Sequence, residues 1–276
     1  MPAPPASRLR AGTSFPSPFI MFKTSSCRAA IAAVLLAMVT PETLASVVLT
    51  GTRVIYSESE REVSLKLTNE GDAPALVQAW IDDGDPNATP ENAKSPFTLT
   101  PPLFRLDAKK GQTLRIIQIQ QALPRDQESL FWLNVLEVPP VASSSKDQQN
   151  SLQFAFRSRI KLFFRPTGLP GDADSAPTKV TWRFARKDDG HHVLRATNPT
   201  PYHITYTKVE AAAGGHVYSN DAGAMVNPGG TVEFAMDDTS PVSGEPAQVS
   251  YTFISDYGAS VSGIHNAKPM QKAKGQ

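Results

Sequence analysis

One long alternating stretch, Ser151–Pro166, constrains the fold more than any other segment of the chain. Successive side chains of an extended strand point to opposite faces, so every second residue shares a face. The apolar face of this stretch carries Leu152, Phe154, Phe156, Ile160, Leu162 and Phe164. The polar face carries Gln153, Arg157, Arg159, Lys161 and Arg165. Because a typical strand has only about five or six residues, we expect one end of this strand to extend past the core of its domain.

The composition is that of a folded protein large enough for one large or two ordinary domains. The chain has 276 residues, of which 40% are hydrophobic and 19% are charged. Its formal net charge of +1 provides no global field that would attract nucleic acid, so nucleic acid is not an expected partner. Cys27 is the single cysteine, which excludes an internal disulfide and a cysteine-based metal or redox site.

Residues 1–45 are typical of a signal peptide region for export. A basic start, Met21–Arg28, precedes a short apolar run, Ala29–Val39, and small residues follow up to Ala45. We expect cleavage after Ala45. The Pro- and Ser-rich residues before Met21 fit no part of a signal peptide. We therefore hypothesise that translation starts at Met21. The apolar run is shorter than the roughly 20 residues that a membrane span needs, and no later segment is apolar enough to form one.

Short apolar runs separated by turn residues predict an all-β fold in the first half of the exported chain. The expected extended segments are Val47–Tyr56, Glu62–Asn69, Ala75–Ile81, Phe97–Leu106, Gly111–Ile119, Glu128–Val138 and the long stretch Ser151–Pro166. Within them, Thr100-Pro101-Pro102 predicts a kink or a cis peptide bond. About seven strands are typical of an immunoglobulin-like sandwich.

Pro and Gly residues in Arg165–Gly171 predict a domain boundary, after which short strands resume. The expected strands of the second half are Lys179–Ala185, His192–Thr197, His203–Val209, His216–Ser219, Thr231–Ala235 and Gln248–Ser255. We therefore expect an N-terminal sandwich over residues 46–165, a second sandwich over residues 166–264, and a polar tail over residues 265–276.

The motifs of common enzyme classes are missing from the chain. No nucleophile elbow, phosphate-binding loop or dinucleotide-binding glycine motif occurs in a suitable context. His191 and His192 are adjacent on an expected strand, so their side chains point to opposite faces and cannot easily share a metal ion. Asp82–Asp85 lacks the spacing of a calcium loop and is interpreted as a solvated turn. The sequence predicts no enzyme and no cofactor.

Two alternatives are open for the apolar row at the start of the long strand, Leu152, Phe154 and Phe156. The row either packs inward in its own sandwich or projects as an edge strand that a partner can pair with.

Two cations, Arg53 and Lys161, interrupt apolar strands close to the expected domain boundary. If they converge in a cleft, they suit a carboxylate or a phosphate. The alternative is that both side chains are solvated. For a third set, Glu128, Arg165 and Asp256, the spacing does not show whether the residues meet.

The run Leu152–Pro166 closely resembles the signature strand of the periplasmic pilus-assembly chaperones of the chaperone–usher pathway. Further segments match that family in the same order, and the resemblance covers essentially all of the chain after Ala45. They are Thr52–Tyr56, Thr100–Pro102, Phe104–Leu106, Glu128–Asn134, Glu137–Pro140, Asn198–Tyr202 and Ile254–Gly258.

The resemblance implies two immunoglobulin-like β-sandwich domains in a boomerang arrangement. It implies a chaperone that binds pilus (fimbrial) subunits by donor-strand complementation, a known form of strand addition, and delivers them to an outer-membrane usher. Carried onto this chain, Arg53 and Lys161 would anchor the C-terminal carboxylate of a subunit. Leu152, Phe154 and Phe156 would fill the groove that the subunit leaves open.

The resemblance also implies a salt-bridge set, Glu128, Arg165 and Asp256, that sets the angle between the domains. Phenylalanine stands at two groove-filling positions where aliphatic residues are common, which indicates a subunit with roomier pockets. The linker between Pro140 and Ser151 is short and lacks cysteine, as in the short-loop branch of the family.

Two other classes of protein remain as alternatives at this point. The first is an exported structural or adhesive immunoglobulin-like component of a surface fibre. The second is an exported hydrolase, for which the sequence nominates no catalytic residue.

Overall fold

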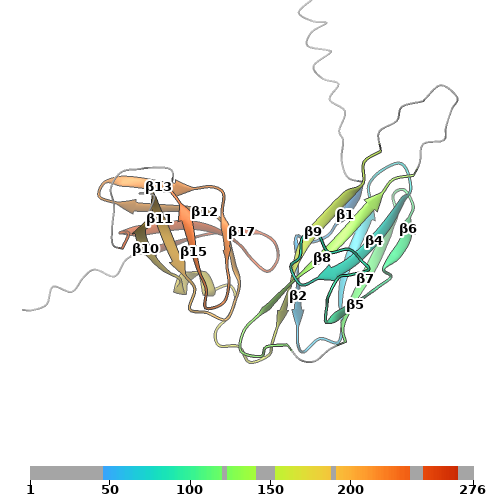
Figure 1. Ribbon diagram of the computed structural model, residues 1–276, viewed down its shortest axis with the longest axis horizontal. Coiled ribbons are helices and arrows are strands. Elements are labelled where there is room, and N and C mark those ends of the chain that lie inside the picture. Colours follow the sequence, from blue (N-terminus) through green and yellow to red (C-terminus); the bar gives the residue numbers. More distant parts are fainter. Residues whose placement is uncertain (1–45, 120–122, 141–152, 188–190, 237–244, 267–276) are drawn as a thin grey trace, which may run out of the picture. The chain divides into compact units, whose positions relative to one another are not determined.

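The computed structural model describes residues 46–119, 123–140, 153–187, 191–236 and 245–266. Over these residues the chain folds almost wholly into strands, which form two β-sandwiches (Figure 1). The expected all-β class with two immunoglobulin-like domains is therefore confirmed. The expected signal region, most of the linker with Leu152, and residues 267–276 lie outside the described residues, so the predictions made for them stay predictions.

The first sandwich consists of two sheets that enclose one apolar core. One sheet has the order β1 (Val47–Leu49), β3 (Val63–Asn69), β7 (Gly111–Gln118) and β5 (Phe97–Thr100). The other has the order β2 (Arg53–Ser57), β9 (Phe156–Arg165), β8 (Ser129–Val138), β4 (Ala75–Asp82) and β6 (Leu103–Leu106).

Alternation along β8 and β9 decides which side chains enter this core. Leu133 and Val135 of β8 are buried, as are Leu162 and Phe164 of β9. Each of these rows lies on one face of its strand, because alternate side chains of a strand share a face. The apolar face of the long strand is thus buried only in its second half, from Leu162 onward, while Ile160 is partly buried at the border of the core.

The expected run Val47–Tyr56 is divided between the two sheets. β1 pairs antiparallel with β3, whereas β2 pairs parallel with β9 in a register that sets Arg53 opposite Lys161. Gly51 lies between the two strands, and a side chain there would crowd the carbonyl oxygen of Arg53. The apolar pattern alone carries no sign of this change of sheet, because it continues through both strands.

The expected kink or cis bond in Phe97–Leu106 is confirmed by a cis peptide bond between Thr100 and Pro101. The strands on its two sides, β5 and β6, belong to different sheets.

The second sandwich has a short sheet and a larger one (Figure 1). The short sheet has the order β10 (Thr181–Arg186), β11 (His192–Thr197) and β15 (Thr231–Ala235), and a 3-10 turn, η1 (Ala176–Lys179), precedes it. The larger sheet has the order β13 (His216–Asn220), β12 (Ile204–Ala213), β16 (Gln248–Ile254) and β17 (Ser260–Asn266), and β14 (Ala224–Val226) also pairs with β12.

Aromatic side chains dominate the second core. The Trp182 ring lies 5.3 Å from the Tyr206 ring and 5.9 Å from the Phe234 ring, centroid to centroid. Two strands, β14 and β17, were not expected from the sequence. β14 is very short, and β17 is a largely exposed, Ser- and Gly-containing edge strand without a buried alternating row. β17 continues to Asn266, past the end expected for the second domain. Among the described residues, no helix is long and apolar enough to cross a membrane.

Candidate functional site

Strand β9 has partners on both sides over only part of its length. On one side, β8 pairs with β9 from Phe156 to Phe164. On the other side, β2 pairs with it only from Lys161 to Arg165. Among the described strands, none pairs with this second side between Phe156 and Ile160. We call this half of β9, from Phe156 to Ile160, the β9 edge, because its main chain on that side has no partner among the described strands.

One exposed aromatic side chain begins the β9 edge, and a second lies two residues before it. Phe154 is 59% exposed and Phe156 is 42% exposed, whereas Leu162 and Phe164 are buried further along the same strand. Of the two interpretations of this row, the exposure favours projection from the sandwich over inward packing. Leu152, the third predicted member of the row, lies outside the described residues. An exposed apolar row on an unpaired edge is the combination that strand addition requires.

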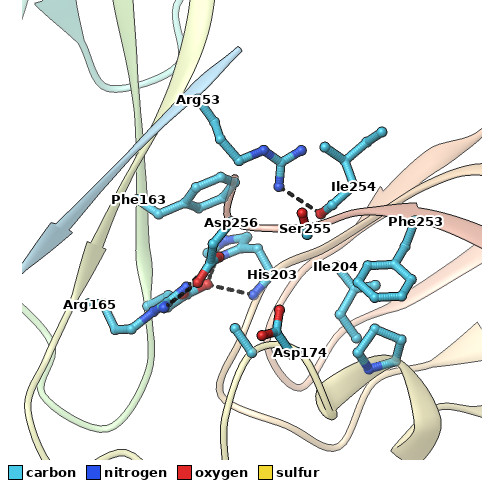
Figure 2. A pocket seen from close by; sticks show the side chains of 13 residues that line it. Arg53, Phe163, Arg165, Asp174, His203, Ile204, Phe253, Ile254, Ser255 and Asp256 are labelled. Atoms are coloured by element: carbon cyan, nitrogen blue, oxygen red, sulfur yellow. Dashed lines mark hydrogen bonds and ion pairs between the residues drawn. The ribbon is translucent and has the colours of Figure 1, made fainter. Parts of the chain in front are cut away.

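The cations Arg53 and Lys161 come together because β2 and β9 pair in parallel. Both side chains line a cleft of about 260 Å³. The cleft is also lined by Thr52, Trp132, Arg159, Ile160, Ile254 and Gly258. Lys161 Nζ donates a hydrogen bond to Thr205 Oγ1 (3.0 Å), and Arg53 Nη1 donates one to the carbonyl oxygen of Ile254 (3.0 Å; Figure 2). Among the described residues, no carboxylate forms an ion pair with either cation.

The two positive charges in the cleft therefore lack an ion-pair partner among the described residues. Burial, together with the nearby charge of Arg53, lowers the pKa of Lys161 to about 8. Burial also lowers the pKa of Arg53, although the charges of Asp256 and Glu128 act in the opposite direction. Two half-buried cations that form no ion pair with a described carboxylate favour an anion such as a carboxylate, because its charge and hydrogen bonds compensate their desolvation.

Glu128, Arg165 and Asp256, whose meeting the sequence left open, form one connected ion-pair set. Arg165 Nε donates to Glu128 Oε1 at 2.7 Å. The two terminal nitrogens of Arg165 donate to both oxygens of Asp256, at 2.7 and 2.9 Å (Figure 2). Burial alone would lower the pKa of Arg165, but Asp256 and Glu128 outweigh it and raise the pKa. The main-chain N–H of His203 also donates to Glu128, so the set joins residues of both sandwiches.

The turn after β16 places Asp256 toward Arg165. Gly258 in this turn has φ of 78°, a left-handed conformation that favours glycine. Its Cα also lies so close to the side chain of Thr52 that a β-carbon would collide with the Thr52 hydroxyl. The turn therefore packs against Thr52, next to the cleft that Arg53 and Lys161 line.

One buried carboxylate of this region was not recognised in the sequence. Asp82 was interpreted as part of a solvated turn, which is wrong, because Asp82 ends β4 and is fully buried. Its carboxylate accepts hydrogen bonds from Arg159 Nη2 (2.6 Å), Asn134 Nδ2 (2.7 Å) and the main-chain N–H of Gly84 (2.7 Å). Burial alone would raise the pKa of Asp82, but these hydrogen bonds outweigh it and lower the pKa.

Two arginines on the polar face of the β9 edge, Arg157 and Arg159, pack on tryptophan rings of the neighbouring strands, and Arg159 also pairs with Asp82. The guanidinium carbon of Arg159 lies 4.3 Å from the centre of the Trp132 ring, and that of Arg157 lies 4.9 Å from the Trp80 ring. We call these five residues the Asp82 network. Its members come from three adjacent strands, so only the register of β4, β8 and β9 reveals it.

We expect the Asp82→Ala variant to lose roughly 2–3 kcal/mol in the free energy of unfolding. Removing one partner of a buried ion pair leaves the other charge uncompensated and costs about 3–5 kcal/mol, and we reduce this figure because the Arg159 side chain is 22% exposed. Unfolding by denaturant, followed by fluorescence, measures the change. The control is Asp107→Ala in the exposed pair with Arg105, which should cost less than about 1 kcal/mol. Equal losses in the two variants would contradict this assignment.

Comparisons with known proteins agree on one family for both sandwiches. The family described as "Pili and flagellar-assembly chaperone, PapD N-terminal domain" matches residues 46–170. The family described as "Pili assembly chaperone PapD, C-terminal domain" matches residues 175–265.

Individual proteins show the same similarity. The probable fimbrial chaperone YadV of Escherichia coli K12 is 42% identical over 227 residues, which are 80% of this chain and 89% of YadV. A crystal structure of YadV matches with a TM-score of 0.66 and covers 81% of this chain and all (100%) of that one. A structure of the Salmonella enterica SafA pilin in complex with the SafB chaperone matches with a TM-score of 0.66 at 26% identity, over 82% of this chain and 98% of that one.

Proposed function

The chain belongs to the pilus-assembly chaperone family, and on this premise we propose how its described residues act. This is a family of chaperones and not a class of enzymes. We propose that the protein binds pilus subunits in the periplasm, completes their fold by donor-strand complementation and delivers them to an outer-membrane usher. The observation that carries the proposal is the β9 edge, which pairs with no described strand on one side, with exposed Phe156 on it and exposed Phe154 just before it. Beside it lie two cations that form no ion pair with a described residue.

The β9 edge would supply the strand that an incomplete subunit lacks. Main-chain groups between Phe156 and Ile160 can form a ladder with a subunit strand whatever the side chains are, which suits several different subunits. Phe154 and Phe156, together with Leu152, would enter the apolar groove of the subunit. The SafA–SafB complex supports this step, because there a similar chaperone is in complex with a pilin.

The cation cleft would fix the register of this pairing. Lys161 is five residues from Phe156, about 17 Å along an extended strand. A subunit whose terminal carboxylate is held by Arg53 and Lys161 can therefore place its last strand along the β9 edge. A slip of one residue would turn the wrong side chains toward the groove, so an anchored chain end would protect the pairing from slippage.

The ion-pair set of Glu128, Arg165 and Asp256 would maintain the geometry between the two sandwiches. Buried ion pairs often barely compensate for desolvation, so we assign this set a geometric role. It joins the loop before β8, the end of β9 and the turn after β16.

Export would place the chaperone in the periplasm. We propose that residues 1–45 are a signal peptide region, removed by cleavage after Ala45, and that the two domains span residues 46–165 and, because β17 continues to Asn266, residues 166–266. Both similar chaperones and both family matches support assembly over fibre structure, so the alternative of a structural or adhesive fibre component is not favoured.

Combined replacement of the two cations, Arg53→Ala with Lys161→Ala, should reduce capture of a subunit at least about tenfold, because each lost charge-assisted hydrogen bond costs about 1.5–3 kcal/mol. The measurement is the soluble complex recovered from the periplasm after co-expression with a candidate subunit. Arg105→Ala with Lys109→Ala removes the same charge at exposed positions and should leave recovery unchanged. If the Arg53→Ala, Lys161→Ala variant gave normal recovery, the two cations would not anchor the subunit.

The Phe154→Glu variant should also lose capture, because it places a carboxylate in an apolar groove without a partner. The matched control is Gln153→Glu, which adds the same charge to the neighbouring exposed residue, also just before β9. The same co-expression assay compares the two variants. If both capture the subunit equally well, the Phe154 side chain does not enter the subunit.

Binding of a free C-terminal carboxylate should weaken as the pH rises through about 8. Below the pKa of about 8, Lys161 is charged and ready to bind, whereas above it binding must first take up a proton. A peptide with the C-terminal sequence of a subunit should therefore bind about tenfold more weakly at pH 9 than at pH 7. Titration calorimetry over this range measures the change.

The control for the pH dependence is Lys161→Arg, because arginine stays charged throughout this range. Its affinity should remain level between pH 7 and pH 9. A wild-type affinity that does not change, or a decline of equal size in the arginine variant, would show that Lys161 does not titrate on binding.

A further inference from the structure

A second buried carboxylate, Glu137, lies at the end of the inward-facing row of β8. It follows Phe131, Leu133 and Val135 on the same face of the strand, and it is 6% exposed. A carboxylate in such a place is costly unless it is hydrogen-bonded and its charge is compensated. Among the described residues, no lysine, arginine or histidine forms an ion pair with it.

Among the described residues, the donors to the Glu137 carboxylate are Ser46 and Val47, at the start of the described chain. Its Oε1 accepts from the main-chain nitrogen of Ser46 at 3.1 Å and from the Ser46 hydroxyl. Its Oε2 accepts from the main-chain nitrogen of Val47 at 2.9 Å. The two carboxylate oxygens therefore hold Ser46, the residue before β1, and Val47, the first residue of β1, which is the outermost strand of its sheet.

We propose that Glu137 is the binding site and counter-ion of the α-ammonium group of the mature chain. The inference rests on the proposed cleavage after Ala45. In that step a signal peptidase adds water across the Ala45–Ser46 bond, which leaves a carboxylate on Ala45 and an amine on Ser46 that takes up a proton. The match to the N-terminal family domain also begins at residue 46.

Cleavage changes what the nitrogen of Ser46 offers to Glu137. In the precursor this atom is a neutral amide with one N–H. In the mature chain it is an ammonium with three N–H groups and a positive charge, and charge-assisted hydrogen bonds are roughly twice as strong as neutral ones. Processing therefore supplies the missing charge to a carboxylate that the sandwich already buries.

The position of Glu137 connects this site with the β9 edge. Glu137 pairs in register with Phe156, the first residue of β9. The bound chain start thus secures β1 at the end of the sandwich from which the exposed aromatic row projects. A chain with its leader still attached lacks this ion pair, so the mature form is the more stable one.

Other charged groups near Ser46 lie in the turn after β3. The main-chain N–H of Glu70 donates to the carbonyl oxygen of Ser46 at 2.7 Å. The side chains of Glu70 and Asp72 are exposed, and Asp72 pairs with Lys109 at 3.1 Å. Glu70→Gln is therefore a matched control, because it removes one carboxylate from the same neighbourhood without changing the buried one.

The test measures the pKa of the α-amine in protein purified from the periplasm. Intact mass first establishes that the chain starts at Ser46. Competitive acetylation between pH 6 and pH 10, followed by mass spectrometry of the N-terminal peptide, then reports the amine pKa. We expect it at least about one unit above the ordinary 7.7–8.0 in wild type and in Glu70→Gln, and within the ordinary range in Glu137→Gln.

The outcomes separate this inference from the proposed function. A chain that starts at Ser46 with an ordinary amine pKa, or with a raised pKa that persists in Glu137→Gln, overturns the inference and leaves export and chaperone function intact. A different mature start overturns both the cleavage position and this site. Should Glu137→Gln fail to fold, wild type serves alone: selective acetylation of its α-amine must lower the unfolding midpoint, and an unchanged midpoint overturns the inference.

Discussion

The rest of the structure depends on how much of β9 each of its two neighbouring strands pairs with. β8 accompanies nearly all of β9, whereas β2 accompanies only its second half. One strand therefore contains both a core element, with Leu162 and Phe164 buried, and an open edge. Because the parallel register sets Arg53 opposite Lys161, the same pairing places two cations where the open edge ends. The open edge and the two neighbouring cations are thus consequences of a single register.

An open apolar edge is a liability that most proteins cover or interrupt, since it invites aggregation. In this protein the polar face of the same segment packs against the neighbouring strands. The Asp82 network keeps Arg157 and Arg159 against the rings of Trp80 and Trp132. An edge that is already extended and held loses less entropy when a partner strand pairs with it. The buried carboxylate of Asp82 therefore helps to fix the polar face of a segment whose apolar face carries exposed Phe156.

Much of the fold could be predicted from local patterns. Alternation located most strands, the Thr100–Pro101 bond was anticipated as a kink or cis bond, and family resemblance supplied the two-sandwich architecture. Patterns failed where no buried row exists, as in β14 and the exposed β17. They also failed at Asp82, because an acidic residue next to other acidic residues and a glycine indicates a turn. Only contacts with strands far along the chain account for its burial.

The sequence by itself determined the two faces of the long strand, the cations at its apolar–polar border and the family to which the chain belongs, because periodicity and motifs are local properties. The tertiary structure decided which part of the apolar face is buried and which is exposed, since this depends on where β2 ends. It also decided that Glu128, Arg165 and Asp256 meet, and that Glu137 receives the start of β1. These contacts join residues distant along the chain, and sequence spacing carries no information about such distances.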